Sequence, residues 1–265
     1  MFEKFVFNGY SSDMFNIICV SFNENNSDDY SAGAQTEFIT EGNYDGSKWY
    51  STSNKYNESL SYTIQIIKNP CIGEYLTKDE TRAILKWLVS PSDYKPFKID
   101  DDFFYGENFR VKFTNPKYKV VGNLVRGLEL MLNFDRPFSL SDDIVIKHLI
   151  NNTGNIILYN NSDESEKSLY PKCVTINVIK DGTIILHNQR DDVHVFTEFK
   201  DCVSGEVIQL NCEERRIRST NSSIPIMERF NKNWVRLLEG KNLITITGSC
   251  EIIFTYNEIR RVGVW

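Results

Sequence analysis

The stretch CVTINVIKDGTIILHN, residues Cys173–Asn188, decides the fold class of this 265-residue chain. It holds two short runs rich in Ile, Val and Thr, the residue types that favour β-strands. The dipeptide Asp181-Gly182 between the two runs is a turn signal. The same alternation of short strands and turn signals continues from Ile144 to Asn257. This spacing predicts a β-sandwich in the second half of the chain.

The first half of the chain also carries strand patterns. In ESLSYTIQIIK, the side chains of Leu60, Tyr62, Ile64 and Ile66 share one face, which is typical of a half-buried strand. The 17 Phe and 13 Tyr residues of the whole chain favour strands over helices as well. The sequence therefore predicts a mainly β protein.

One helix is predicted in the first half, over TKDETRAILKWLVSPSD. Thr77 and Glu80 have the spacing of a capping box, and Ser90-Pro91 ends the helical pattern. We expect the helix to pack on the sheet through an apolar stripe and to place its tryptophan in the core rather than in a ligand site. The residues of this stripe are Ala83, Ile84, Trp87 and Leu88.

Two polar segments interrupt the strand patterns. Asp135–Asp143, DRPFSLSDD, contains Pro137 and is the best candidate for an interdomain linker, so we expect domains at 1–136 and 137–265. The longer polar stretch Asn23–Ser47 is interpreted as a functional loop or one that a partner orders.

Composition and charge exclude several classes of protein. The net charge is −6 and the basic residues are scattered, which argues against specific nucleic-acid binding. Arg216 and Arg218 form the nearest thing to a basic patch, and alternation predicts that they lie on one solvated strand face. The chain has no apolar run long enough for a membrane span and no signal-peptide core near Met1. The six cysteines form no CxxC pair, and we expect buried free thiols.

The sequence contains no motif of a catalytic, cofactor or metal site. It has no GxSxG, HExxH, GxxxxGK[ST] or strand-linked GxGxxG, so we expect no enzyme activity, no cofactor and no catalytic residue. His187 and His194 are not spaced with Cys202 and Cys212 as a compact zinc site requires. The acidic run Asp100–Asp102 lacks the residues of a calcium loop and predicts a solvated hairpin turn.

The sequence leaves glycoside hydrolysis and sugar binding open as functions. Glu213-Glu214 and Glu251 are candidates for a glycosidase carboxylate pair, although only a structure gives their separation. Three aromatic residues could stack on sugars, but ordinary packing is the favoured interpretation of all three. They are Tyr44, Trp49 and Trp265.

The order of these features resembles the distal tail proteins of tailed bacteriophages and phage-tail-like particles. The resemblance spans nearly the whole chain and lies in the order and spacing of several weak elements rather than in one signature. In the first half these elements are FVFNG, LTKDETRAILKWLVSPSDYKPFKIDDD and LELMLNFDRPFSL. In the second half they are LYPKCVTINV, GEVIQLNCEERRIRS and NWVRLLEGKNLITITG.

The resemblance implies a fold and an assembly. It implies an N-terminal β-barrel-like domain with one α-helix, residues 1–136, that forms a ring, usually hexameric. It also implies a C-terminal β-sandwich of galectin-like or carbohydrate-module-like shape, residues 137–265. The implied partners are other copies of the chain, a tail-tube protein, a tail-tip hub protein and, in some members, receptor-binding proteins.

The resemblance also implies a function and a location. The protein would be a structural adaptor in the tail tip or baseplate, assembled in the bacterial host cytoplasm. The alternatives are a carbohydrate-binding β-sandwich module for cell-surface attachment and a β-sandwich glycosidase. The sequence lacks the long inserted domains by which some family members bind glycans, and it identifies no interface residues.

The stretch Asn233–Gly248, NWVRLLEGKNLITITG, is interpreted as the most family-like hairpin of this scaffold. WVRLL and LITITG would be its strands and Glu239–Asn242 its turn. Trp234 is expected to anchor the sandwich and Arg236 to be an exposed partner. If Trp234 is buried, its replacement by alanine should cost about 3–5 kcal/mol of folding stability.

Overall fold

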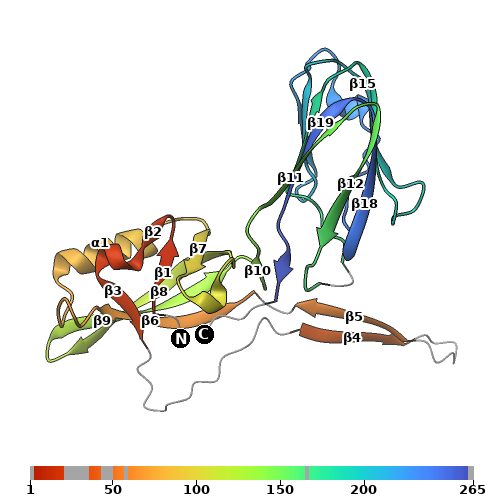
Figure 1. Cartoon of the computed structure of the whole chain (residues 1–265). Coiled ribbons are helices and arrows are strands. Elements are labelled where there is room, and N and C mark those ends of the chain that lie inside the picture. The colour runs from red at the N-terminus through yellow and green to blue at the C-terminus, as the bar shows by residue number, and fades with distance from the viewer. Residues whose placement is uncertain (1–2, 21–35, 43–49, 57–58, 165–166, 262–265) are drawn as a thin grey trace. The chain divides into compact units, whose positions relative to one another are not determined.

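The computed structural model describes residues 3–20, 36–42, 50–56, 59–164 and 167–261 (Figure 1). The chain divides into two compact units, Met1–Leu140 with Arg261–Trp265, and Ser141–Arg260. The division falls inside the predicted linker segment Asp135–Asp143. Most elements are β-strands, so the predicted mainly β, two-domain fold is confirmed.

The first unit is built on a seven-stranded antiparallel sheet with the strand order β2-β1-β7-β8-β9-β6-β3. Among the described residues no strand ladder joins β2 to β3, so the sheet is open. One hydrogen bond indicates that the sheet nevertheless curls towards a barrel. The Cys19 amide of β3 donates to the Glu3 carbonyl, just before β1, at 2.8 Å. The strands are β1 (Phe5–Phe7), β2 (Tyr10–Ser11), β3 (Ile17–Val20), β6 (Ser61–Lys68), β7 (Lys95–Ile99), β8 (Phe109–Val121) and β9 (Leu124–Phe134).

Helix α1 (Lys78–Leu88) forms where the sequence predicts it. The Thr77 hydroxyl accepts from the Glu80 amide at 3.2 Å, and the Glu80 carboxylate accepts from the Thr77 amide at 2.8 Å. The predicted capping box is therefore confirmed.

The buried face of α1 packs into an aromatic core, and it consists of Thr81, Ile84, Trp87 and Leu88. Ala83, which the sequence placed on this stripe, is exposed, so that part of the prediction is wrong. Trp87 stacks on Phe5 and Phe15 with ring centroids 5.6 Å and 4.3 Å away, and its indole N–H donates to the Phe7 carbonyl at 3.1 Å. Trp87 is a core residue, as predicted, because its ring is enclosed and its one polar atom is satisfied.

Two segments of the first unit refine the sequence predictions. The acidic run Asp100–Asp102 lies between the paired strands β7 and β8, and the Asp101 carboxylate caps the 3-10 helix η2 (Asp102–Phe104) by accepting from the Phe103 amide at 2.9 Å. A second 3-10 helix, η1 (Ser12–Phe15), precedes β3. The polar stretch Asn23–Ser47 contains the strand β4 (Thr36–Gly42), and the rest of that stretch lies outside the described residues.

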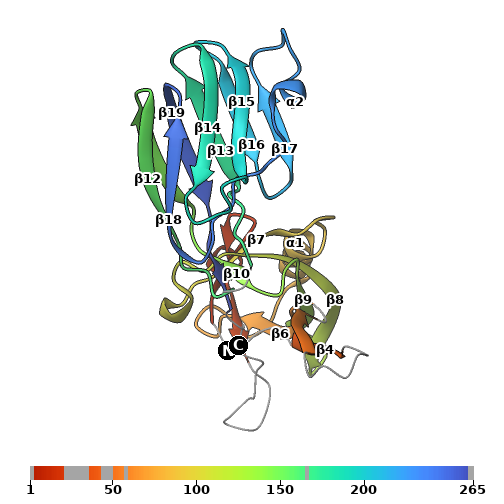
Figure 2. The ribbon, with the colours of Figure 1, turned by 90° about the vertical axis from the view of Figure 1, so that its right-hand side faces the viewer.

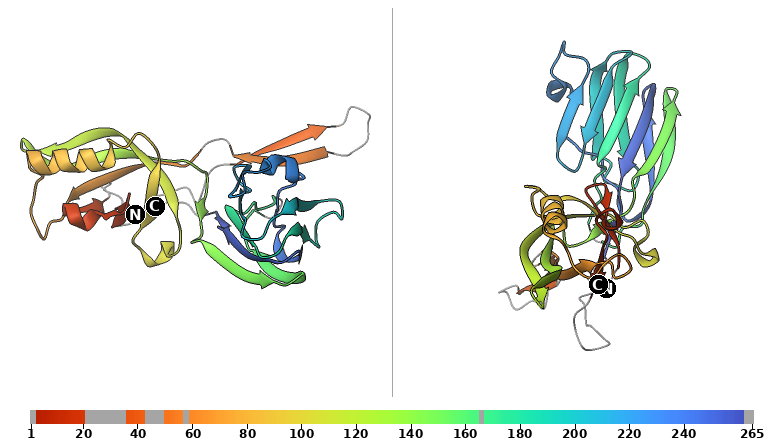
Figure 3. Two further views of the ribbon diagram at one scale, coloured as in Figure 1. Left: turned by 90° about the horizontal axis from the view of Figure 1, so that it is seen from above. Right: turned by 90° about the vertical axis from the view of Figure 1, so that its left-hand side faces the viewer.

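The second unit is a β-sandwich, as predicted, with a five-stranded sheet of order β11-β19-β13-β16-β17 and a four-stranded sheet of order β12-β18-β14-β15 (Figures 2 and 3). Every pair of neighbouring strands is antiparallel, and the core lies between the two sheets. The strands are β11 (Ile144–Ile150), β12 (Thr153–Asn160), β13 (Cys173–Val178), β14 (Gly182–Asn188), β15 (Phe196–Cys202), β16 (Val207–Asn211), β17 (Arg216–Ser219), β18 (Gly240–Thr247) and β19 (Cys250–Tyr256). The second unit also contains α2 (Ile226–Arg229) and β20 (Ile259–Arg260), whereas β10 (Ser139–Leu140) belongs to the first unit.

The predicted hairpin over Asn233–Gly248 is wrong in its first half. LITIT lies in β18, which pairs with β12 and β14. The predicted turn Glu239–Asn242 is also wrong, because Gly240–Asn242 belong to β18. WVRLL forms no strand and makes only an isolated bridge between Leu237 and Leu169.

Buried asparagine side chains take the place of the missing strand partner. Asn242 is fully buried, accepts from the Leu238 amide at 2.8 Å and donates to the Leu238 carbonyl at 2.7 Å. Asn188 donates to the Arg236 carbonyl at 3.1 Å, and Asn160 donates to the Leu237 carbonyl at 3.2 Å. These bonds satisfy the backbone of a segment that runs beside the sheet without joining it.

The roles predicted for Trp234 and Arg236 also need correction. Trp234 is only partly buried at the border of the core, where its ring meets Phe230 edge-on at 5.1 Å. Arg236 is not an exposed partner, because its guanidinium forms two bonds of 2.7 Å with the Asp191 carboxylate. The hydrogen bonds to Asp191 raise the pKa of Arg236 further above its usual range.

Candidate assembly surfaces

The histidine and cysteine candidates do not form a metal centre. Across residues 3–20, 36–42, 50–56, 59–164 and 167–261, no group of three or more His, Cys, Asp or Glu side chains is placed to hold a metal ion. His194 is exposed, whereas Cys202 and Cys212 are buried. Burial raises the pKa of both thiols to about 12, so both are protonated near neutral pH.

All six cysteines are free thiols. Cys19, Cys202, Cys212 and Cys250 are buried, as predicted. The exceptions to the expected burial are Cys71, which is exposed, and Cys173, which is half-buried.

The carboxylates considered for glycoside hydrolysis lie apart. Asn177 on β13 pairs with Glu251 on β19 and with Val207 on β16, so Glu251 and Val207 lie at the same level of the sheet. Glu213 and Glu214 follow Asn211, which lies four residues further along β16. This offset is about 13 Å along the strand, which exceeds the separation that glycosidase pairs use. Hydrogen bonds from Lys147 and Asn177 lower the pKa of Glu251, the opposite of what a general acid requires.

The aromatic residues considered as a sugar platform, Tyr44, Trp49 and Trp265, lie outside the described residues. The arginine face of β17 forms as predicted, with Arg216 and Arg218 exposed on one side and Ile217 half-buried on the other. Arg216 pairs with Glu214 at 3.0 Å, so this face carries both signs of charge. None of the helices in the described ranges has the length and hydropathy needed to span a membrane.

A buried ion pair joins Arg229 and Glu206 in the second unit. The Arg229 guanidinium bonds to both oxygens of Glu206, at 2.6 Å and 3.1 Å, and also donates to the Asp201 carbonyl at 2.9 Å. Burial by itself would raise the pKa of Glu206, but the bonds from Arg229 and from the Ser219 hydroxyl outweigh it and lower the pKa. The two terminal nitrogens of Arg229 are satisfied by Glu206 and the backbone, although its buried Nε has no hydrogen-bond partner among the described residues, and the pairing indicates a structural role.

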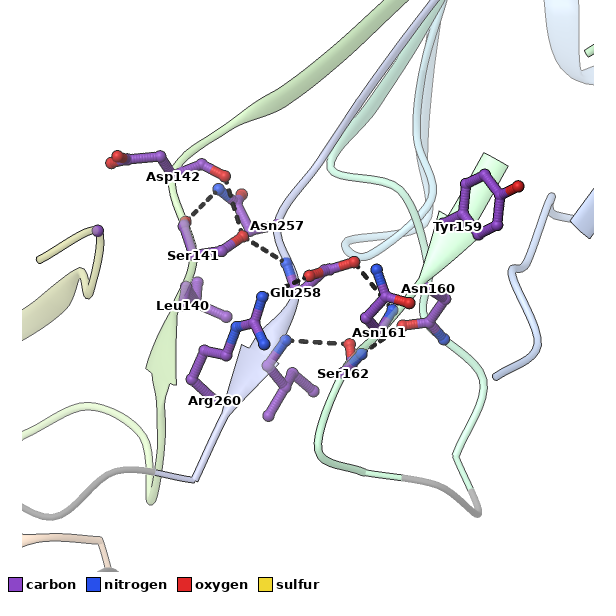
Figure 4. A network of polar contacts seen from close by, with 12 residues as sticks. Leu140, Ser141, Asp142, Tyr159, Asn160, Asn161, Ser162, Asn257, Glu258 and Arg260 are labelled. Atoms are coloured by element: carbon purple, nitrogen blue, oxygen red, sulfur yellow. Dashed lines mark hydrogen bonds and ion pairs between the residues drawn. The ribbon is translucent and has the colours of Figure 1, made fainter. Parts of the chain in front are cut away.

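A network of polar contacts joins the two ends of the second unit (Figure 4). The Ser141 amide donates to the Glu258 carbonyl, and the Glu258 amide donates to the Ser141 hydroxyl oxygen, both at 2.9 Å. The buried Glu258 carboxylate accepts from the Asn161 amide at 2.8 Å and from Arg260 at 2.7 Å. The segments that begin and end this unit are therefore held together.

Strands β4 and β5 (Tyr50–Tyr56) form a hairpin of their own. Seven residue pairs, from Thr36↔Tyr56 to Gly42↔Tyr50, match the two strands along their full length. Among the described strands, neither β4 nor β5 pairs with any other. An isolated two-stranded hairpin is marginally stable in water and offers unpaired edges, so this hairpin is a candidate for assembly with another surface.

The end of the β8–β9 hairpin is an exposed apolar surface. Its exposed fractions are 57% for Tyr118, 55% for Val120, 61% for Val121 and 40% for Leu124. No motif in the sequence analysis covers this surface. The signal was Gly122-Asn123 between apolar runs, since both residues adopt positive φ, as a two-residue hairpin turn requires.

The sandwich has apolar edges as well. β11 and β12 each lie at one edge of their sheets. Their outward side chains include Val145 and Leu149 on β11, and Ile157 and Tyr159 on β12. Exposed edges of this length are sites where another strand can add, so the second unit also offers an assembly surface.

Comparisons with known proteins agree with this arrangement. A family model described as phage tail protein N-terminal domain matches residues 1–136, and one described as phage tail C-terminal domain matches residues 138–256. Among curated proteins, none matches the chain.

Two solved structures resemble the whole chain. The first is the crystal structure of the SPP1 Dit (gp 19.1) protein, described as a paradigm of hub adsorption apparatus in Gram-positive infecting phages. Its TM-score is 0.62 at 13% identity, covering 97% of this chain and 99% of that chain. The second is a chain of the phage p2 baseplate in its activated conformation with Sr. Its TM-score is 0.50 at 9% identity, covering 96% of this chain and 98% of that chain.

At these identities the two structures show a shared fold, whereas the family models match both halves of the sequence. The predicted resemblance is thereby confirmed for family and fold. The chain belongs to the phage tail protein family that these two domain models describe.

Proposed function

We propose that this protein is a structural adaptor of the tail tip or baseplate of a phage or a phage-tail-like particle. Copies of the first domain, residues 1–136, associate into a closed ring, with six copies as the expected number. The second domain, residues 137–265, projects from this ring. The ring joins the tail tube to the tail-tip hub, and its periphery holds receptor-binding proteins where the particle has them.

The β4–β5 hairpin carries the proposal of a ring. It has fourteen strand residues, from Thr36 to Gly42 and from Tyr50 to Tyr56, and its strands pair only with each other among the described strands. A hairpin of this kind gains stability when it lies on a neighbouring subunit, and a ring supplies such a neighbour for every copy.

The place of the protein in the particle is proposed from its fold. The SPP1 Dit protein is described as part of a hub adsorption apparatus, and this chain shares its fold over nearly its full length. We infer a location at the virion tail tip, with assembly in the bacterial host cytoplasm. The role is structural rather than catalytic and requires no cofactor, no membrane and no specific nucleic acid.

The test is the mass and shape of the full-length protein, alone and with the tail-tube protein of the same particle. Light scattering and negative-stain imaging should give closed rings with the mass of six 30.8 kDa chains. Replacing Thr36–Tyr56 by a short Gly-Ser linker should leave a folded protein that no longer closes the ring. A protein that stays monomeric at high concentration with and without the tail-tube protein would refute the proposal.

A further inference from the structure

We propose that the closed end of the β8–β9 hairpin in one copy docks on the acidic loop Asp100–Tyr105 of the next copy. This inference rests on the proposed ring and names the two surfaces that join its neighbouring subunits. It is carried by an exposed apolar hairpin end, by opposite charges on the two surfaces, and by their positions in the first unit.

The hairpin end projects beyond the strands that flank it. On β9, the last partner of the neighbouring strand β6 is Gly127, paired with Ile67. The pairs Val120↔Val125 and Val121↔Leu124 continue past that point to the turn. Because side chains alternate between faces, Val120 and Val121 point to opposite sides. Both sides of the hairpin end therefore present an exposed apolar residue. Covering these side chains with a partner surface would be favourable, because it removes apolar surface from water.

The hairpin end carries excess positive charge. Lys117, Lys119 and Arg126 lie within ten residues of one another, and no acidic residue occurs between Lys112 and Leu128. Carboxylates from outside this interval contact the cations. Glu129 pairs with Lys117 at 3.1 Å and with Lys119 at 2.5 Å, and Glu74 pairs with Arg126 at 3.0 Å. The hairpin end itself, Lys117–Arg126, contributes three cations and no carboxylate.

The loop before β8 has the complementary composition. Asp100, Asp101 and Asp102 are all exposed, and no basic residue occurs between Ile99 and Phe109. Two aromatic residues of the loop are exposed as well, Phe103 by 62% and Tyr105 by 88%. The loop therefore offers three carboxylates and two exposed rings, which match the cations and aliphatic side chains of the hairpin end.

The two surfaces lie at opposite ends of the same strand. The acidic loop precedes Phe109, the first residue of β8, and the turn follows Val121, its last residue. The thirteen residues of β8, which include a bulge at Asn115, span at most about 40 Å. Figure 1 shows the closed end of the hairpin and the loop before β8 at opposite ends of this sheet. One copy cannot bring its own two surfaces together, so the fitting occupant is a second copy of the chain.

Contact between two different surfaces is heterologous, and a heterologous contact that repeats around a rotation axis closes a ring. Every copy then supplies one hairpin end and one acidic loop. Complementary charge sets the register of the two surfaces, and the apolar side chains of both leave water on contact.

The experiment exchanges the charges of each surface in the full-length chain. The hairpin variant carries Lys117→Glu, Lys119→Glu and Glu129→Lys, which keeps the two local ion pairs with reversed signs. The loop variant carries Asp100→Lys and Asp102→Lys, and it keeps Asp101 because that carboxylate caps η2. The matched control is Lys78→Glu with Arg82→Glu, two exposed positions on α1.

Sedimentation velocity over a concentration series measures the self-association of each protein, and thermal unfolding verifies that each is folded. We expect each surface variant to associate about 100-fold more weakly than the wild type, because like charges then face each other. The control should associate as the wild type does. An equimolar mixture of the two surface variants should regain assembly, because each junction then joins opposite charges.

The remaining outcomes separate this inference from the proposed function. If the wild type forms rings and both variants form them equally well, the docking contact is wrong and the ring stands. If the variants associate normally but lose binding to the tail-tube or hub protein, the surfaces serve that partner and the inference is overturned. If the wild type never associates, with or without the tail-tube protein, both proposals fail.

Discussion

At the scale of single residues, three buried asparagine side chains hold in place a segment of the second unit that joins neither sheet. Asn160, Asn188 and Asn242 are each at most 6% exposed and bond to the backbone of Arg236–Leu238. An amide side chain can donate and accept at once, so one asparagine replaces both bonds that a neighbouring strand residue would make. This explains how a segment with a strand-like sequence stays outside the sheets.

Replacing Asn242 by alanine should destabilise the second unit strongly. The Leu238 amide and carbonyl would lose their partners in a buried place, and we expect a loss of about 2–4 kcal/mol in the free energy of unfolding. Urea denaturation followed by tryptophan fluorescence measures the change. Asn155→Ala, at an exposed position of β12, is the control and should change stability by less than about 0.5 kcal/mol. Equal effects at the two positions would contradict the role given to Asn242.

Replacing Arg229 by methionine should also destabilise the second unit strongly, because it leaves the Glu206 carboxylate buried without its cation. The side chains of Arg229 and Glu206 are only 2% and 1% exposed, and breaking such a pair costs about 3–5 kcal/mol. The double variant Arg229→Met with Glu206→Gln removes both charges and should recover part of this loss. Urea denaturation of the wild type, Arg229→Met and the double variant measures their order of stability. A double variant less stable than Arg229→Met would refute the explanation.

At the scale of elements, local patterns predicted what forms inside one segment. The capping box of α1 was readable because Thr77 and Glu80 bond to each other, and most of the apolar stripe was readable because its spacing repeats within the segment. The two-residue turn at Gly122-Asn123 is equally local, since both residues adopt positive φ between apolar runs. The interpretation of WVRLL failed because its partners are asparagines up to 77 residues away in the sequence.

The ion pair at the start of α1 predicts a dependence of stability on pH. The hydrogen bond from Lys68, together with the Thr77 amide, lowers the pKa of Glu80 to about 2. In the unfolded chain this carboxyl titrates near its ordinary value, about 4.3. The stabilisation is therefore complete above that value and is lost as the pH falls towards 2.

Lys68→Met should accordingly reduce the loss of stability of the first unit between pH 4.5 and 2 relative to the wild type. Urea denaturation at a series of pH values measures the slope. Lys78→Met is the control, because Lys78 is exposed on α1 and the bonds of Glu80 stay in place. If Lys68→Met and the wild type lose stability in parallel, the Lys68–Glu80 bond is not the source of the low pKa.

At the scale of the whole molecule, each unit has its own hydrophobic core and its own sheets. The second unit also holds its two ends together through Ser141 and Glu258 (Figure 4). We therefore expect residues 141–260, produced alone, to fold cooperatively with the thermal transition that this unit has in the full chain.

A shorter fragment, residues 144–256, is the matched control for that prediction. It keeps β11 and β19 but lacks Ser141, Asn257 and Glu258, so the bonds that close the ends of the unit are lost. Its Tm should be lower by about 5 °C or more, since roughly 1 kcal/mol shifts the Tm of a domain of this size by that amount. Calorimetry measures the Tm of both fragments. Identical values would show that the bonds through Ser141, Asn257 and Glu258 contribute nothing to stability.

The sequence by itself determined the mainly β class, the position and cap of the helix, the sandwich pattern after Ile144 and the resemblance to phage tail proteins. These follow from periodicity, turn residues and the order of short elements, all of which are local. The tertiary structure decided which strands pair. β13 and β14 are neighbours in the chain, yet they lie in different sheets, while β18 pairs with β12 from the far end of the unit. Pairing, burial and exposure depend on contacts between distant residues, and alternation within a strand is the same whichever partner it meets.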